Sequence, residues 1–230
     1  MVDVRTPLIL VVDDDPLILH SITLSLQQEG YDVAPAATGT EALAIAERDA
    51  PDLVILDLVL PDLTGVEVCR RLRRTSSVPV LYLSARKEEV DKVVALDAGG
   101  DDYVSKPVGL AELVARVRAQ LRRGHGQALG TVHRSGVVMV DSGAHRVTVR
   151  ELEVEVTPRE FSILLALIER RGQALSRRDL LERIWGPDWF GDDNVLDVYV
   201  RQLRIKIETD PSRPKYIETV RGVGYRFAAL

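Results

Sequence analysis

The sequence predicts an α/β fold with a doubly wound parallel sheet in its first half, followed by a smaller α+β domain. Apolar, strand-like stretches alternate with helical segments five times before about residue 122. The rhythm then changes to short strands, helices and a closing hairpin. The 230 residues leave room for two domains of ordinary size, each with a core of its own. Repeated strand–helix units are typical of a parallel sheet covered by helices on both faces.

Five strand–helix units are expected in the first half. The central strand lies in the run 52–58, where Val54, Ile55 and Leu56 indicate burial on both faces. Thr38 and Glu41 form a capping-box pattern that predicts the start of a helix. The other strands are expected at 8–12, 31–34, 78–83 and 102–105. The helices are expected at about 16–28, from 38 to the residue before Pro51, from the loop 61–65 to about 73, at 88–98 and at about 110–122.

The second half is expected to begin with a small antiparallel sheet. Thr157 with Glu160, and Ser176 with Asp179, are typical of helix starts. The strands are expected at 137–140, 146–149 and 152–156, a third helix at about 193–208, and a closing hairpin at 216–220 and 225–227. We therefore predict a first domain at 1–122, a flexible linker at 123–134 and a second domain at 135–230.

The net charge of −5 is unevenly divided. Residues 1–121 carry 12 Lys and Arg against 20 Asp and Glu, a net charge of −8, and residues 122–230 carry 18 against 15, a net charge of +3. The first half is expected to repel nucleic acid and the second to tolerate or seek it. The single cysteine, Cys69, excludes an internal disulfide. Because no apolar run reaches about 18 residues and no signal peptide is evident, we expect a cytoplasmic protein without membrane contact.

Polar side chains stand where the predicted strands end. Asp13, Asp14, Asp57, Ser84 and Lys106 follow different strands, and the carboxyl ends of parallel strands meet at one edge. Carboxylates that converge there repel one another unless a cation lies among them, and oxygen ligands favour Mg²⁺. A carboxylate can attack phosphorus to give an aspartyl phosphate. The alternative, that each acid is a solvated loop residue or a helix cap, is the interpretation we adopt for Asp15, which precedes Pro16.

Four segments in order resemble the receiver domain of response regulators: 11–16, 56–65, 84–86 and 100–107. The sequence departs from the family pattern at two positions, with Val108 where a Phe is usual and Gly100 where an Ala is usual. The resemblance implies that Asp57 accepts a phosphoryl group from a sensor histidine kinase.

The same resemblance implies the roles of the neighbouring residues. Asp14, Asp57 and the backbone carbonyl of Val59 would hold Mg²⁺, with Asp13 acting largely through water. Lys106 would contact the phosphoryl group, and Ser84 and Tyr103 would form the switch.

The predicted helix 193–208 has an apolar stripe facing the core, formed by Leu196, Val200, Leu203 and Ile207. Other faces carry valines turned away from that stripe beside Arg and Gln, a combination that suits a DNA major groove. An ordinary surface helix remains the alternative from this helix alone. The side chains concerned are Val195, Val198, Arg201, Gln202 and Ile205, flanked by Arg204 and Lys206.

The order of sheet, three helices and hairpin resembles the winged-helix DNA-binding domain of OmpR/PhoB-type response regulators, on residues 152–161, 175–181, 194–204 and 219–226. The resemblance implies a (βα)5 receiver domain joined to a winged-helix (α+β) domain. It implies that Arg221 enters a minor groove and that the loop with Trp189 and Phe190 faces RNA polymerase; packing of these aromatics on the core is the alternative. The residues implied to face DNA are Val195, Val198, Arg201, Gln202 and Arg204.

In the resembled family, charged side chains pair between two receivers on activation, which predicts a homodimer. The implied pairs are Lys92 with Glu112, Asp102 with Arg116, and Asp101 with Arg123. Solvated charges on one face are the alternative.

The sequence as a whole predicts a response regulator that controls transcription and is not an enzyme. One alternative is a Mg²⁺-dependent phosphatase or phosphotransferase that uses Asp57. A haloacid-dehalogenase-like enzyme, however, would carry its nucleophile after the first strand and would have a cap domain. A second alternative is an atypical, phosphorylation-independent DNA-binding regulator.

Overall fold

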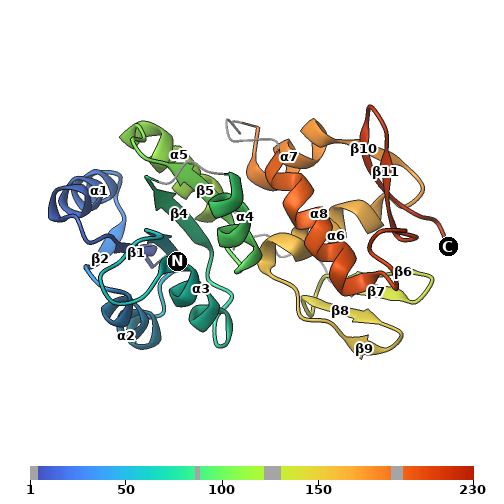
Figure 1. The fold of residues 1–230 in the computed structure, drawn as a ribbon, viewed down its shortest axis with the longest axis horizontal. Helices are drawn as coiled ribbons and strands as arrows, with labels where there is room; N and C mark the ends of the chain where they lie inside the picture. The colour runs from blue at the N-terminus through green and yellow to red at the C-terminus, as the bar shows by residue number, and fades with distance from the viewer. Residues whose placement is uncertain (1–4, 86–88, 122–130, 188–193) are drawn as a thin grey trace. The chain divides into compact units, whose positions relative to one another are not determined.

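The computed structural model describes residues 5–85, 89–121, 131–187 and 194–230, except for the side chains of Glu89, Val90 and Lys92 (Figure 1). The chain divides into two compact units, Met1–His125 and Gly126–Leu230. Among the helices of the described residues, none is both long enough and apolar enough to span a bilayer.

The N-terminal unit is built on a five-stranded parallel sheet in the order β2-β1-β3-β4-β5, which confirms the doubly wound fold. The order reverses at β1, which lies between β2 and β3. The strands are β1 (Leu8–Val12), β2 (Asp32–Ala36), β3 (Leu53–Leu56), β4 (Val80–Ser84) and β5 (Asp102–Ser105). The helices are α1 (Pro16–Gln28), α2 (Gly39–Asp49), α3 (Gly65–Arg73), α4 (Glu89–Asp97) and α5 (Leu110–Leu121).

Alternate residues of each central strand enter two separate cores. Leu10 and Val54 pack on the side of α2 and α3, and Ile9 and Ile55 pack on the side of α1 and α5. Figure 1 shows these helix pairs on opposite faces of the sheet. All of β3 is buried, as its unbroken apolar run predicts. Both faces are therefore filled with apolar side chains, and polar chemistry is confined to the edge where the strands end.

Short polar side chains begin the helices of this unit. Thr38 accepts a hydrogen bond from the Glu41 amide at the start of α2, as the capping-box pattern predicts. Asp15 accepts from the amides of Leu17 and Ile18, which confirms its role as the cap of α1. Each cap satisfies backbone donors that have no partner within the helix.

The C-terminal unit combines two small antiparallel sheets with helices α6 (Pro158–Glu169), α7 (Arg177–Trp185) and α8 (Asn194–Ile207). Capping boxes at Thr157 and Ser176 start α6 and α7, as predicted. The first sheet has the order β6-β7-β8-β9, with β6 (Val132–Ser135), β7 (Val138–Asp141), β8 (Arg146–Val149) and β9 (Leu152–Glu153). The second has the order β10-β12-β11, with β10 (Ala174–Ser176), β11 (Ile217–Val220) and β12 (Gly224–Phe227).

Three strands of this unit differ from expectation. Strand β6 begins at Val132, within the range 123–134 that we predict as linker. Strand β9 covers only Leu152 and Glu153 of the predicted 152–156, and β10 has no counterpart among the predicted strands. Edge strands that expose most of their side chains carry little apolar periodicity, so the sequence pattern marks them weakly. The closing hairpin, β11 with β12, lies where it is predicted.

Candidate functional site

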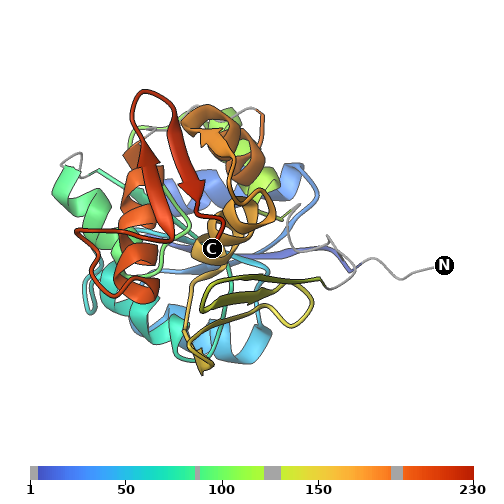
Figure 2. The ribbon, with the colours of Figure 1, turned by 90° about the vertical axis from the view of Figure 1, so that its right-hand side faces the viewer.

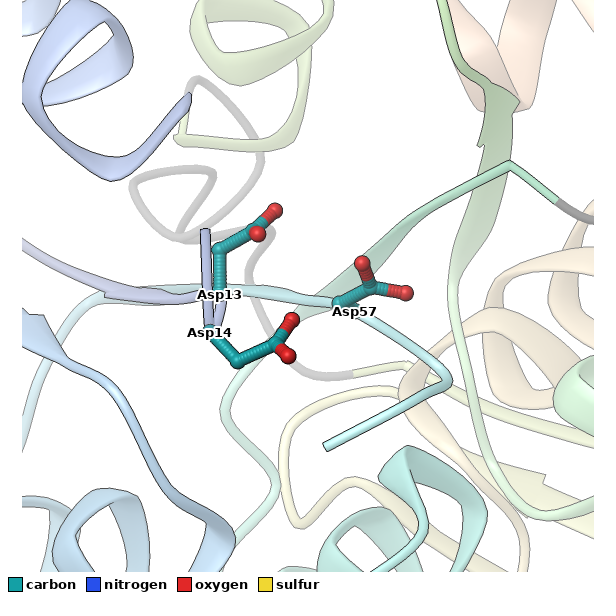
Figure 3. A group of neighbouring side chains, drawn as sticks. All are labelled: Asp13, Asp14 and Asp57. Atoms are coloured by element: carbon teal, nitrogen blue, oxygen red, sulfur yellow. The ribbon is translucent and has the colours of Figure 1, made fainter. Parts of the chain in front are cut away.

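Three carboxylates meet at the carboxyl edge of the parallel sheet (Figure 3). Asp13 and Asp14 follow β1, and Asp57 follows β3, the adjacent strand. One carboxylate oxygen from each lies within 4.8 Å of the others. Asp13 and Asp57 are buried, whereas Asp14 is exposed. The group is thus open on one side, and its oxygen atoms are the ligand type that Mg²⁺ prefers.

Lys106 joins this group from the end of β5. Its Nζ atom donates to Asp13 Oδ2 and to Asp57 Oδ2, each at 2.5 Å. The peptide bond between Lys106 and Pro107 is cis. One ammonium group thus lies between two buried carboxylates that come from strands far apart in the sequence. Without this cation the two acids would repel each other at low effective dielectric.

Burial and pairing act against each other on these groups. Burial raises the pKa of the Asp13 carboxyl above its usual value, and the hydrogen bond from Lys106 offsets only part of this effect. Burial lowers the pKa of Lys106, but its hydrogen bonds to Asp13 and Asp57 and their negative charges together outweigh that, and the pKa is raised overall. Lys106 therefore stays protonated at neutral pH and supplies a permanent positive charge beside Asp57.

Ser84 and Tyr103, the predicted switch residues, lie on adjacent strands. Ser84 ends β4 and is buried, and Tyr103 of β5 is half-buried. Tyr103 is in register with Tyr82 of β4, and their ring centroids are 6.5 Å apart. A Cβ atom at Gly100 would lie 2.4 Å from the ring of Tyr82. The bulky Tyr82 thus explains the glycine where the receiver pattern has alanine.

The loop after β3 is closed at its base and bound to the site. The Gly65 amide donates to Leu58 O at 2.9 Å, and the Val59 amide donates to Asp57 Oδ1 at 3.1 Å. Val59 itself is exposed. Its backbone therefore stands next to the carboxylate that the sequence predicts as phosphoacceptor.

Helix α8 buries a wider face than predicted. The predicted core residues Leu196, Val200, Leu203 and Ile207 are all buried. Val195 is buried too, at 7% exposure, so the expectation that it turns away from the core is wrong. Val195 lies about 100° around the helix axis from Leu196. The buried Tyr199 lies between these two directions and so extends the apolar stripe as far as Val195.

The exposed face of α8 is centred on other side chains. Arg201 is exposed, and Val198 and Gln202 are half-buried, so all three lie outside the buried stripe. Ile205 is 51% exposed on this face, as the helical spacing predicts, although the family resemblance does not imply that it faces DNA. Asn194 is also exposed on this face, and the same spacing, centred opposite Leu203, would have found it.

Helix α8 lies beside the hairpin of β11 and β12 (Figure 2), and Arg204 joins the two. It donates from Nη2 to Ile217 O at 2.7 Å and to Thr219 Oγ1 at 2.8 Å. Arg221 is exposed at the turn between β11 and β12. The hairpin is thus tied to the helix while its tip leaves Arg221 accessible.

A second cluster, which the sequence does not predict, fixes the start of α8. Asp197 accepts from Tyr225 Oη at 2.6 Å and pairs with Arg177 Nε at 3.3 Å. Burial, followed by the bond to Asp197, raises the pKa of Tyr225 to about 12. The guanidinium groups of Arg177 and Arg204 lie 5.1 and 5.7 Å from the Tyr225 ring centroid. Helices α7 and α8 and the hairpin thus meet at one tyrosine.

Charged residues expected to pair between two chains have partners within one chain. Arg116 Nη1 lies 3.1 Å from Asp102 Oδ2, and Arg116 Nη2 lies 2.8 Å from Glu112 Oε1. Asp101 Oδ2 pairs with Arg73 Nη2 at 2.8 Å and accepts from the Val80 amide. The Lys92 side chain, Arg123, Trp189 and Phe190 lie outside the described residues.

Comparison with known proteins agrees with this organisation. Residues 9–118 match the family described as response regulator receiver domain, and residues 151–227 match transcriptional regulatory protein, C terminal. The transcriptional regulatory protein AfsQ1 of Streptomyces coelicolor is 44% identical over 220 residues, covering 96% of this chain and 97% of AfsQ1. The DNA-binding response regulator MtrA of Mycolicibacterium smegmatis is 44% identical over 218 residues, 95% of each chain.

A solved structure gives the same result. The response regulator DrrB, described as a Thermotoga maritima OmpR/PhoB homolog, is 33% identical, with 97% of this chain and 100% of DrrB covered and a TM-score of 0.53. Receiver and DNA-binding matches thus occur in order along one chain, and the relatives match it over nearly their full length. The chain belongs to the OmpR/PhoB family of two-component response regulators, with an N-terminal receiver domain and a C-terminal winged-helix DNA-binding domain.

Proposed function

We propose that Asp57 accepts a phosphoryl group from a sensor histidine kinase, with Mg²⁺ as cofactor, and that this event controls DNA binding. The observation that supports the proposal most strongly is Lys106 between Asp13 and Asp57, with Asp14 beside them at the sheet edge. This arrangement offers a carboxylate nucleophile, a fixed positive charge and a set of oxygen ligands in one place. The charge of the transferred group is neutralised where it arrives.

Each residue of the site has a defined task in this proposal. Asp57 attacks phosphorus, its new O–P bond forming as the N–P bond to the kinase histidine breaks and the imidazole leaves. Asp14, Asp57 and the Val59 carbonyl would hold Mg²⁺, with Asp13 acting largely through water. When bound, the ion supplies positive charge to the phosphoryl oxygens. Lys106 supplies a second cation from the end of β5.

Phosphorylation would act on the switch residues and then on the dimer face. The phosphoryl group adds about −1.5 to −2 charges at neutral pH. Ser84 donates to it, and Tyr103 rotates to follow. Asp102, Glu112 and Arg116 would exchange their pairs within the chain for pairs across a homodimer, joined by Lys92. Asp101 would have to give up its ion pair with Arg73, or pair with both arginines, in order to reach Arg123 of the partner chain.

In the DNA-binding domain, we propose that the exposed face of α8 enters the major groove. Val198, Arg201 and Gln202 would meet the bases, and Arg221 would reach the minor groove from the hairpin tip. Arg204 would fix the angle between helix and hairpin while remaining close to the backbone phosphates. RNA polymerase would be contacted through the loop of Trp189 and Phe190. Dimerisation places two such domains on adjacent half-sites, which raises affinity through effective concentration.

Incubation of the folded chain with acetyl phosphate and Mg²⁺ tests the proposal. We expect the mass of one phosphoryl group to be added to the wild type and none to Asp57→Asn. Beryllofluoride with Mg²⁺ is expected to convert monomer to dimer in sedimentation. Selection of DNA from a random pool, with and without the phosphodonor, should recover a direct repeat or inverted repeat only in the activated state. An unmodified wild-type chain under these conditions would contradict the proposal.

A further inference from the structure

Asp62 lies in the loop after β3 and accepts hydrogen bonds from the start of a different helix. Its Oδ1 accepts from the Gly39 amide at 2.8 Å. Its Oδ2 accepts from the Thr40 amide at 2.9 Å and from Thr40 Oγ1 at 2.6 Å. The first two amides of α2 are thus satisfied by a carboxylate that is 22 residues away in sequence from Thr40.

The start of α2 is suited to this carboxylate. Thr38 caps the third amide of the helix, at Glu41, so the side chains of Thr38 and Asp62 together satisfy the three leading donors. The amide ends of helices favour negative charge. The bonds from the Thr40 hydroxyl and amide hold the pKa of Asp62 well below its usual value, so the carboxylate is charged at neutral pH.

The loop can reach α2 only because residue 39 is a glycine. A Cβ atom there would lie 2.7 Å from Val68 Cγ2 and 2.9 Å from Leu63 Cβ. Any side chain would therefore push the loop and α3 away from the helix. Leu63, beside Asp62, packs against the apolar core on the same side of the sheet. The contact is thus close and is supported by the packing of the core.

The same corner of the fold also holds the Asp13 segment. The Asp13 amide donates to Ala36 O at 3.1 Å, and Ala36 ends β2 just before α2. The segment that carries Asp13 and the loop that carries Val59 are therefore bonded to the same short stretch, 36–40. The loop has two anchors: the Gly65–Leu58 backbone bond at its base and Asp62 near its tip.

We infer that Asp62 is a positioning residue that ties the loop carrying Val59 to the start of α2 and so sets the spacing of the proposed Mg²⁺ ligands. The inference rests on the proposed function only for the identity of the ion and of Val59 as a ligand. Release of this anchor leaves every proposed ligand in the chain but lets the Val59 carbonyl move relative to Asp13, Asp14 and Asp57. The consequence is weaker metal binding with unchanged chemistry once the ion is bound.

The experiment compares the full-length wild type with Asp62→Asn, Thr40→Val and Glu41→Gln. Asp62→Asn places an amide nitrogen against backbone donors, and Thr40→Val removes only the hydroxyl bond. Glu41→Gln is the matched control, because the Glu41 carboxylate accepts from the Ala37 amide at the same helix end. Calorimetric titration with MgCl2 gives the dissociation constant, and thermal unfolding gives the stability of each variant.

We expect Asp62→Asn to raise the Mg²⁺ dissociation constant about tenfold, the low end of what outer-shell partners of a metal site contribute. Thr40→Val should raise it about twofold to threefold. A double variant that combines Asp62→Asn with Thr40→Val should match Asp62→Asn, because the two residues share one interaction. The phosphorylation rate at saturating Mg²⁺ should stay within about twofold of wild type for every variant, since only binding is weakened. Glu41→Gln should lower the melting temperature without changing the dissociation constant.

Wild-type affinity in both Asp62→Asn and Thr40→Val would overturn the inference, as would an equal loss of affinity in Glu41→Gln. If Asp62→Asn fails to fold, the Mg²⁺ dissociation constant of Thr40→Val alone decides whether the inference holds. A wild type that binds Mg²⁺ but is not phosphorylated would contradict the proposed function and leave this inference to be decided by the binding constants.

Discussion

The sheet edge of the receiver and helix α8 of the DNA-binding domain both present a small set of polar side chains, but they position them differently. At the sheet edge, side chains up to 93 residues apart, such as Asp13 and Lys106, bond directly because their strands end at the same edge of the sheet. On α8, neighbouring side chains in sequence point to different surroundings: Val195 is buried, and Val198 is half-buried. Topology determines which side chains meet at the first site, and helix rotation determines which side chains are exposed at the second.

This difference has a physical origin. A parallel sheet has one carboxyl edge, so any residue that follows a strand arrives there, whatever its exact position. On a helix each residue turns by about 100°, so a stripe that is one residue wider changes which side chains face water. Substitutions at the two sites test this contrast.

Replacing Lys106 should affect stability most. Lys106→Met leaves Asp13 and Asp57 buried beside each other without their shared cation, and we expect the free energy of unfolding at pH 7 to fall by about 3 kcal/mol. Mg²⁺ should restore part of the loss, because it binds only the folded state. Urea unfolding with and without MgCl2 measures both effects. Unchanged stability without Mg²⁺ would show that the ammonium group does not hold the carboxylates together.

Two valines of α8 test the rotation of the helix. Val195→Ala removes two buried methyl groups and should lower the free energy of unfolding by about 2 kcal/mol, including the cavity it leaves. Val198→Ala should change it by less than about 0.5 kcal/mol. Denaturant unfolding of the full chain, followed through the transition of the DNA-binding domain, gives both free energies. Equal effects would contradict the helix orientation described above.

Two arginines of α8 are expected to differ in role: Arg201 in DNA binding and Arg204 in the stability of the domain. Arg201→Ala removes an exposed side chain, so we expect DNA affinity to fall about tenfold without loss of stability. Arg204→Ala removes bonds to Ile217 and Thr219 and should lower the free energy of unfolding by about 1 kcal/mol. Fluorescence anisotropy with the selected DNA and thermal unfolding measure the two effects. A stability loss in Arg201→Ala alone would reverse the assigned roles.

Tyr225 gives the smallest effect and a pH signature. Tyr225→Phe removes the hydrogen bond to Asp197 and should lower the free energy of unfolding by about 1 kcal/mol at neutral pH. The folded pKa of Tyr225, about 12, is above the usual 10.0, so the unfolded chain loses this proton first. The contribution is therefore complete below the usual pKa and declines as the pH rises toward the folded value. Comparing both proteins across that range checks the sign: a gap that widens with rising pH would contradict it.

Most of the fold could be predicted because its signals are local and repeated. The central strand, the caps at Thr38, Thr157 and Ser176 and the closing hairpin follow from short patterns. Strand β6 pairs with the next strand, β7, but buries only Ser135, so little apolar periodicity marks it. Strand β10 could not be predicted either, because its partner is distant in sequence. Strand β10 is held by β12, about 50 residues later.

The functional sites follow the same rule. The convergence of Asp13, Asp14, Asp57 and Lys106 follows from strand ends, and the structure brings them together. The roles of Asp62 and of Asp197 depend on contacts between loops and helices that no spacing reveals. The burial of Val195 depends on how the neighbouring helices pack around α8. Side chains fixed by topology could thus be predicted, and those fixed by packing could not.

The most direct test of the central claim is to locate the phosphoryl group after incubation with acetyl phosphate and Mg²⁺. Borohydride reduction of the acyl phosphate followed by peptide mass spectrometry identifies the modified residue. The account predicts a label at Asp57 alone, which disappears when Mg²⁺ is chelated. A label on Asp13, Asp14 or another residue, or no label on a folded chain with Mg²⁺ present, would contradict it.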